Sequence, residues 1–131
     1  MGARSNLIIR GTRKIYDPTV AHVGMLLASR AGDAVFRRYH DIVCERFWRG
    51  ELDIEDGEAV RSLFVEAGAQ GRDFDESIAF GEGARQCRAI AADAEQRGVF
   101  GVPTFLLQET GELFWGTDRV WLLRERLSAK T

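Results

Sequence analysis

GVFGVPTF, residues 98–105, is the point at which the sequence changes character. Before it, apolar residues recur at three- and four-residue spacing, whereas an apolar run of β-type residues continues from it to Leu107. A Thr-Gly pair at residues 110–111 predicts a turn, and residues 113–115 predict a second strand. This part of the chain therefore predicts an antiparallel hairpin.

Helical spacing of apolar residues predicts four helices before the hairpin and one after it. Gly81 and Gly83 lie inside the fourth helix and indicate a kink or a close helix contact. Residues 7–9, Leu-Ile-Ile, are a candidate short strand. The predicted helices and their start signals are residues 18–31 with Asp17 as N-cap and Pro18 as the first helical residue, 34–48 with Gly32-Asp33, 58–67 with Asp56, 73–97 with a capping box of Asp73 and Glu76, and 119–127 with Gly116-Thr117-Asp118.

Composition limits the class of protein. The chain has 131 residues and a formal net charge of −2, which predicts one domain and excludes a strongly basic nucleic-acid-binding protein. No apolar run reaches the roughly 18 residues that span a bilayer, and the first residues open no secretory signal. We therefore expect a cytoplasmic protein with no membrane or nucleic-acid partner. Within the single domain, 1–131, we expect an irregular segment or short strand over 1–16, a helical part over 17–97 and a strand–strand–helix part over 98–131.

The thiols and imidazoles form no familiar site. Cys44 and Cys87 are 43 positions apart, so there is no CxxC pair, and both are interpreted as small apolar helix residues. Cys87, between two arginines, is the better candidate for a reactive thiol. His22 and His40 have no ligand partners at metal spacing, so no metal site is predicted. The acidic run at residues 53–58 is interpreted as a solvated connection.

Two features of the C-terminal part suit a ligand, and each has a structural alternative. If the Val102–Pro103 peptide bond is cis, the bend presents the backbone of Val102 to an extended peptide; the alternative is a trans proline at a strand start. Thr117 and Asp118 begin a helix, where free N–H groups suit a carboxylate and Asp118 suits an ammonium. The alternative there is an ordinary helix cap.

These segments also resemble a known family. GVFGVPTF, the FWG of the second strand, the TDR at residues 117–119 and the last helix resemble the C-terminal half of a DsbA-like thioredoxin fold. Within it they are most similar to the branch of 2-hydroxychromene-2-carboxylate isomerases and kappa-class glutathione transferases. The helical residues Phe36-x-x-Tyr39, Phe47-Trp48-Arg49-Gly50 and Asp53-Ile54 agree, so the resemblance covers residues 18–127.

The resemblance implies roles for particular residues. Val102 and Pro103 match the cis-proline dipeptide whose first residue pairs its backbone with the cysteinyl part of glutathione. Thr117 and Asp118 match the residues that hold its γ-glutamyl end. The implied cofactor is glutathione and the implied substrate a small aromatic or unsaturated molecule. Trp115 and Phe114 are then expected in the core or in a cleft wall.

The sequence departs from the family at its start. Family members begin with a strand and a helix that carries the active Ser or Cys, whereas residues 1–16 hold no Cys and only Ser5. We therefore expect an α/β, incomplete thioredoxin-like fold with a large helical insertion, followed by a β-hairpin and C-terminal helix, and assign no catalytic residue.

Without the first strand, the hairpin edge would be exposed, so we expect a homo-oligomer. The favoured function is a glutathione-dependent isomerase or oxidoreductase lineage, in a truncated form. The alternative is a non-catalytic glutathione- or partner-binding scaffold. Thiol–disulfide exchange is disfavoured because there is no CxxC pair.

Overall fold

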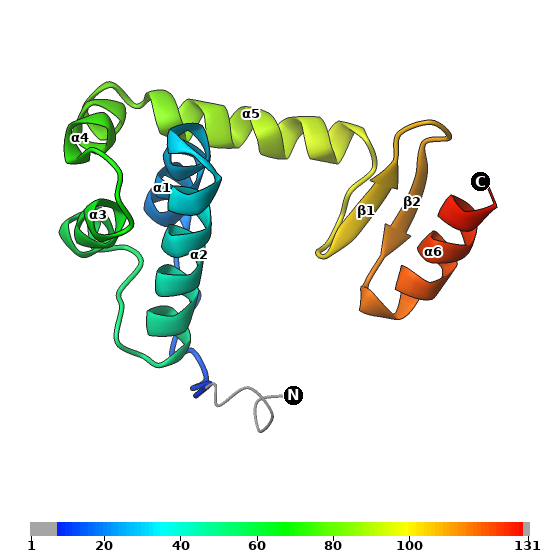
Figure 1. Cartoon of the computed structure of the whole chain (residues 1–131), viewed down its shortest axis with the longest axis horizontal. Coiled ribbons are helices and arrows are strands. Elements are labelled where there is room, and N and C mark those ends of the chain that lie inside the picture. The colour runs from blue at the N-terminus through cyan, green and yellow to red at the C-terminus, as the bar shows by residue number, and fades with distance from the viewer. Residues whose placement is uncertain (1–7, 130–131) are drawn as a thin grey trace. The chain divides into compact units, whose positions relative to one another are not determined.

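The computed structural model describes residues 8–129, which form a mostly helical structure with one two-stranded antiparallel sheet (Figure 1). The chain falls into two compact units, Met1–Arg88 and Ala89–Thr131. The elements are α1 (Thr19–Ala31), α2 (Asp33–Trp48), α3 (Gly57–Glu66), α4 (Gly71–Phe80), α5 (Glu82–Gln96), β1 (Thr104–Leu107), β2 (Glu112–Trp115), the 3-10 helix η2 (Thr117–Arg119) and α6 (Val120–Ser128).

The N-terminal unit has a core between α1, α2, α3 and α4. Tyr39, Phe64 and Phe74 are at its centre, with ring centroids 6.1 Å apart for the first pair and 5.6 Å apart for the second. The Tyr39 hydroxyl donates a hydrogen bond to the carbonyl of Ala21 at 2.8 Å, and burial raises the pKa of Tyr39. The buried cluster consists of Ala21, Ala28, Tyr39, Val43, Leu52, Ile54, Val60, Leu63, Phe64, Ala67, Ala69 and Phe74.

The prediction of a single helix over 73–97 is wrong, because the helix is interrupted at Gly81. This glycine has φ +67° and ends α4, and α5 starts one residue later. Gly83 then packs against its neighbours so closely that a Cβ would lie 2.5 Å from both Ser77 Oγ and Val23 Cγ1. The close helix contact predicted from the glycines is therefore confirmed at Gly83.

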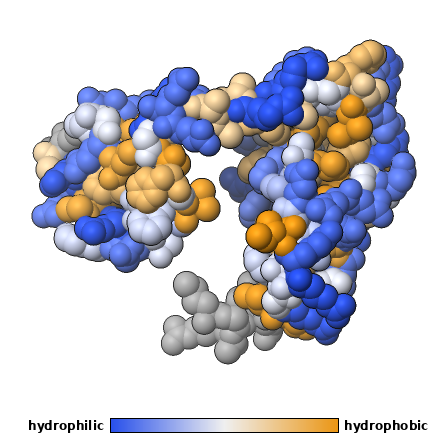
Figure 2. Space-filling view, turned by 180° about the vertical axis from the view of Figure 1, so that it is seen from behind, coloured by the Kyte–Doolittle hydropathy of each residue, from blue (hydrophilic) through white to orange (hydrophobic). Residues whose placement is uncertain are grey.

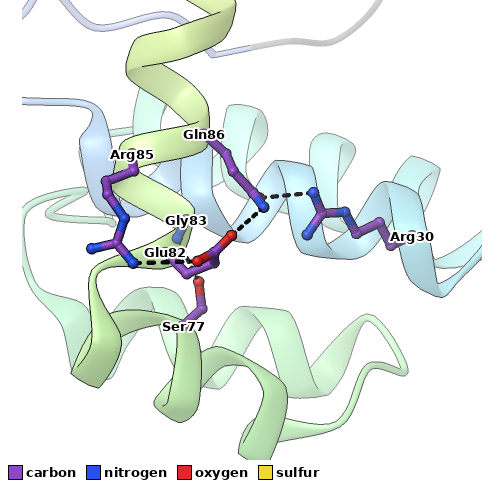
Figure 3. A network of polar contacts seen from close by, with 6 residues as sticks. All are labelled: Arg30, Ser77, Glu82, Gly83, Arg85 and Gln86. Carbon is purple, nitrogen blue, oxygen red and sulfur yellow. Dashed lines mark hydrogen bonds and ion pairs between the residues drawn. The ribbon is translucent and has the colours of Figure 1, made fainter.

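Polar contacts hold this break in place (Figure 3). The buried Ser77 hydroxyl accepts a hydrogen bond from the N–H of Gly83 at 3.0 Å. On the exposed side, Arg30 donates to Gln86 and Gln86 donates to Glu82, both at 2.7 Å, so the first turn of α5 is tied to the end of α1.

The predicted helix starts are correct in part. Asp56 caps α3, as predicted, by accepting the N–H groups of Glu58 and Ala59 at 3.0 and 3.3 Å. Asp17 accepts the N–H and hydroxyl of Thr19, although α1 begins one residue later than expected. The capping box at Asp73 is wrong, because α4 already begins at Gly71 and Asp73 lies in its first turn.

Two further predicted boundaries need correction. Asp33 is the first residue of α2 and caps nothing, since the N-cap position is Gly32. Of the candidate strand over 7–9, Leu7 lies outside the described residues, and Ile8 and Ile9 are not a strand. Both isoleucines are exposed, and the nearby backbone contact is a single hydrogen bond from the N–H of Arg10 to the carbonyl of Trp48 at 2.7 Å. One hydrogen bond to a helix end does not make a ladder.

The C-terminal unit contains the predicted hairpin. β1 pairs with β2 so that Thr104 faces Trp115 and Phe105 faces Phe114, and Gly111, with φ +73°, forms the turn. The first strand is shorter than the apolar run, because residues before Thr104 form bends. The single helix predicted over 119–127 is preceded by the separate turn η2. Across residues 8–129, no helix is both long and apolar enough to span a membrane.

Candidate functional site

The bend before β1 exposes the backbone of Val102. The Val102–Pro103 peptide bond is cis, and Val102 retains 88% of its accessible surface. Within the described residues, neither the N–H nor the carbonyl of Val102 makes a backbone hydrogen bond. The bend therefore offers one free donor and one free acceptor to a ligand.

The connection from β2 to η2 lies directly beside this bend. The N–H of Gly116 donates to the carbonyl of Pro103 at 2.9 Å, which extends the hairpin by one step beyond the Thr104–Trp115 pair. Val102 and Thr117 are the next residues along the chain on either side of this hydrogen bond, so the bend and the start of η2 are neighbours. The four residues that the sequence singles out, Val102, Pro103, Thr117 and Asp118, therefore belong to two neighbouring turns of the C-terminal unit.

Gly116 serves two purposes at this point. Its φ of +90° turns the chain from the strand into η2, and a Cβ there would lie 2.5 Å from Oδ1 of Asp118. The carboxylate of Asp118 therefore lies over the glycine. It is exposed, and it makes no ion pair or hydrogen bond within residues 8–129. An exposed, unpaired carboxylate next to free backbone groups suits a ligand with an ammonium group.

An aromatic pair that the sequence did not identify as a unit borders the bend. Phe100 and Trp115 have ring centroids 5.2 Å apart, and both are exposed. Gly101 permits this packing, because a Cβ there would lie 2.5 Å from Nε1 of Trp115. Figure 2 shows apolar side chains gathered on this unit. In the sequence, Gly101 was the one signal for this aromatic pair, because a glycine permits a close approach of a neighbouring ring. Of the two aromatic residues expected in the core or in a cleft wall, Phe114 lies in the core, with 2% of its surface exposed.

The other sequence candidates lie elsewhere. Cys44 and Cys87 are free, half-buried and both in the N-terminal unit. Among residues 8–129, no group of three or more His, Cys, Asp and Glu side chains is arranged to hold a metal ion. In the acidic run, Glu55 accepts hydrogen bonds from the N–H of Asp17 and from Lys14 Nζ, and these two contacts, in that order, lower the pKa of Glu55. Glu55, in that run, therefore holds the segment before α1 in place through these two contacts.

Comparison with known proteins identifies a family over most of the chain. A family model described as a DSBA-like thioredoxin domain matches residues 7–128. The match includes the bend at Val102, the hairpin and Asp118. Among curated proteins, none matches this chain.

Proposed function

We propose that this chain, which belongs to the DSBA-like thioredoxin domain family, binds glutathione on its C-terminal unit. The match supports a thioredoxin-fold oxidoreductase or isomerase family. Within that range we infer the glutathione-dependent isomerase lineage, with Val102, Pro103, Thr117 and Asp118 as the binding residues. The observation that carries the proposal is the hydrogen bond between Gly116 and Pro103, because it joins the free backbone of Val102 to Thr117 and Asp118.

The backbone at Val102 fits the middle of a short peptide. An extended peptide that pairs with one exposed residue needs one N–H and one carbonyl, and both are free at Val102. Because this pairing uses the backbone alone, it does not depend on which side chain residue 102 carries. The cysteinyl residue of glutathione is the part that would pair here.

Thr117 and Asp118 fit the γ-glutamyl end of glutathione, which is a free amino acid carrying an ammonium and a carboxylate. The carboxylate of Asp118 is exposed and unpaired within the described residues, and it would bind the ammonium. The hydroxyl and N–H of Thr117, at the start of η2, would bind the carboxylate. Hydrogen bonds between charged groups are the strongest ones available at an exposed site.

The aromatic pair supports the substrate class. When bound, glutathione supplies a thiol that adds to an activated double bond. Phe100 and Trp115 border the bend at Val102 and would pack against a small aromatic or unsaturated substrate. The role of the chain in this proposal is to bind and orient the two reactants.

Association into homo-oligomers through the hairpin edge remains a prediction, which light scattering during size-exclusion chromatography tests.

Titration calorimetry with glutathione tests the proposed site. Asp118→Asn removes the charge at nearly constant volume, and we expect binding to weaken by about tenfold or more, since a hydrogen bond to a charged group contributes about 1.5–3 kcal/mol. Glu125→Gln, an exposed carboxylate on α6 of the same unit, is the matched control and should leave the affinity unchanged. Equal affinity in the parent and in Asp118→Asn would refute the assignment.

A second candidate is glutathione binding without turnover. It is favoured because the groups proposed at the site, the free backbone of Val102 together with Thr117 and Asp118, all serve to bind glutathione, and none is assigned a proton transfer. An isomerisation assay with an unsaturated aromatic acid and glutathione separates the two candidates. Turnover that is lost in Asp118→Asn supports the isomerase, whereas binding with no turnover supports the scaffold.

A further inference from the structure

Three side chains on α2 form a nucleophile–base arrangement in the N-terminal unit. Sγ of Cys44 lies 3.8 Å from Nε2 of His40, and Nδ1 of the same ring lies 3.1 Å from Oδ1 of Asp41. Phe36 stacks on the imidazole, with ring centroids 6.3 Å apart and planes 29° apart. The ring of His40 is therefore held from three sides, with one nitrogen toward the thiol and the other toward a carboxylate.

The thiol opens into a cavity of about 370 Å³. Its walls are largely apolar, and Trp48, 42% exposed, provides an aromatic surface one helical turn from Cys44. The residues that line the cavity are Ile8, Ile9, Asp41, Cys44, Glu45, Trp48 and Arg49. A cavity of this volume accommodates a small ring-containing molecule.

The charges around the cavity select against anions. Arg49 is neutralised by Glu45, with Nη2 and Oε1 2.9 Å apart, so Asp41 leaves the wall negative. Nε of Arg49 is buried and has no hydrogen-bond acceptor among the described residues. A buried donor without an acceptor costs free energy, and this cost adds to the constraint on the Arg49 side chain. The largely apolar walls and the unpaired negative charge therefore fit an uncharged, apolar molecule.

Cys44 needs the help of a base to react. Burial, and next the carboxylate of Asp41, raise the pKa of the Cys44 thiol. The thiol consequently keeps its proton near neutral pH, and His40 is the base in contact with it. This differs from the expectation that Cys87 is the better candidate for a reactive thiol.

We propose that Cys44 is a covalent addition site for uncharged, apolar molecules with a carbonyl-activated carbon–carbon double bond. Nε2 of His40 takes the proton from Sγ, and the sulfur electron pair forms a bond to the β-carbon. The π electrons move to the carbonyl oxygen as an enolate. The imidazolium then returns the proton to the α-carbon, so the adduct contains all atoms of both reactants and no oxidant or leaving group is required. The site lies in the N-terminal unit and uses no residue of the proposed glutathione site.

Rates of thiol modification test the proposal on the full chain. The two single-thiol variants, Cys87→Ser and Cys44→Ser, are each treated with N-phenylmaleimide, which is uncharged and aromatic, and with iodoacetate, which is an anion. Intact-mass spectrometry measures the second-order rate constants. We expect Cys44 to react with N-phenylmaleimide at least about tenfold faster than Cys87, because base catalysis contributes this much or more. The preference should disappear with iodoacetate.

A histidine variant separates base catalysis from simple accessibility. In the Cys87→Ser background, His40→Ala should slow the reaction of Cys44 with N-phenylmaleimide by about tenfold, and added imidazole should restore part of the rate. His22→Ala, at an exposed histidine of α1, is the matched control and should leave the rate unchanged. Equal rates for the two thiols, or a rate that does not change in His40→Ala, would overturn the proposal.

Discussion

The N-terminal unit buries a continuous cluster of aromatic and aliphatic side chains, whereas in the described part of the C-terminal unit only Leu107 and Phe114 are buried. The large apolar side chains that the described part of the C-terminal unit leaves exposed are Ile90, Phe100, Val102, Phe105, Trp115, Trp121 and Leu127. Burial of apolar surface is the main source of stability, so the free energy of unfolding resides mostly in the helices. The hairpin unit instead leaves the backbone of Val102 without a hydrogen-bond partner in the described residues, and it leaves several aromatic side chains exposed.

The largest effect is expected in the core of the N-terminal unit. Phe64 is 1% exposed and contacts the rings of Tyr39 and Phe74. Phe64→Ala should lower the free energy of unfolding by about 3–5 kcal/mol, since it removes buried area and leaves a cavity. Urea unfolding followed by far-UV circular dichroism measures this change. Phe80→Ala is the control, because Phe80 is 72% exposed and should change the stability by less than about 0.5 kcal/mol.

The second prediction asks whether the two units depend on each other. Phe114 is 2% exposed and is the largest buried side chain of the hairpin unit. Phe114→Ala should destabilise that unit by about 3 kcal/mol. Hydrogen exchange should then become faster over residues 99–129, with protection of α1, α2 and α3 unchanged. Loss of protection in those helices would show that the stability of the N-terminal unit depends on the hairpin.

Glycines give a smaller effect with a matched control. A Cβ at Gly83 would lie 2.5 Å from Ser77 Oγ and from Val23 Cγ1, whereas a Cβ at Gly57 has nothing within 4 Å. Overpacking by Gly83→Ala should lower the free energy of unfolding by about 1–3 kcal/mol. The higher helix propensity of alanine offsets roughly 1 kcal/mol of that loss. Gly57→Ala should be neutral or slightly stabilising. Similar urea midpoints for the two variants would contradict the close contact.

The same two regions differ in how well the sequence predicted them. The hairpin follows from local signals, which are the apolar run, the turn at Gly111 and the second strand. The turn and the pairing were therefore predicted correctly, whereas the first strand begins later than the apolar run, at Thr104. The contact between Pro103 and Gly116 also follows, because the register of a hairpin is set by its own turn. Phe100 was missed as a partner of Trp115, since that contact depends on the space above Gly101.

In the helical unit, helix boundaries depend on tertiary contacts that periodicity does not contain. Apolar spacing runs through Gly81 without interruption, but the contacts of Gly83 with Val23 and Ser77 fix a break there. The pairing of His40 with Cys44 was missed, because we interpreted Cys44 as a small apolar helix residue and found no partner for His40, although i and i+4 residues meet on a helix face. The cavity beside Cys44 could not be predicted either, because its wall includes Ile8 and Ile9, from outside α2.

The smallest predicted effect concerns Asp56 and Asp73, which were both predicted from the sequence to cap a helix. Asp56 accepts two N–H groups at the start of α3, while Asp73, two residues inside α4, caps nothing. Asp56→Ala should therefore lower the free energy of unfolding by about 1 kcal/mol, the usual cost of losing an N-cap. Asp73→Ala should cost only about 0.3 kcal/mol, from the loss of a negative charge in the first helical turn.

Urea unfolding at two salt concentrations distinguishes the two mechanisms. The cost of Asp56→Ala should persist at high salt, because it comes from two N–H groups left without their acceptor. The cost of Asp73→Ala should vanish there, because salt screens an exposed charge from the helix dipole. If the two variants lost equal stability and responded equally to salt, Asp73 would be an N-cap like Asp56. The helix α4 would then begin at Phe74, and its start at Gly71 would be contradicted.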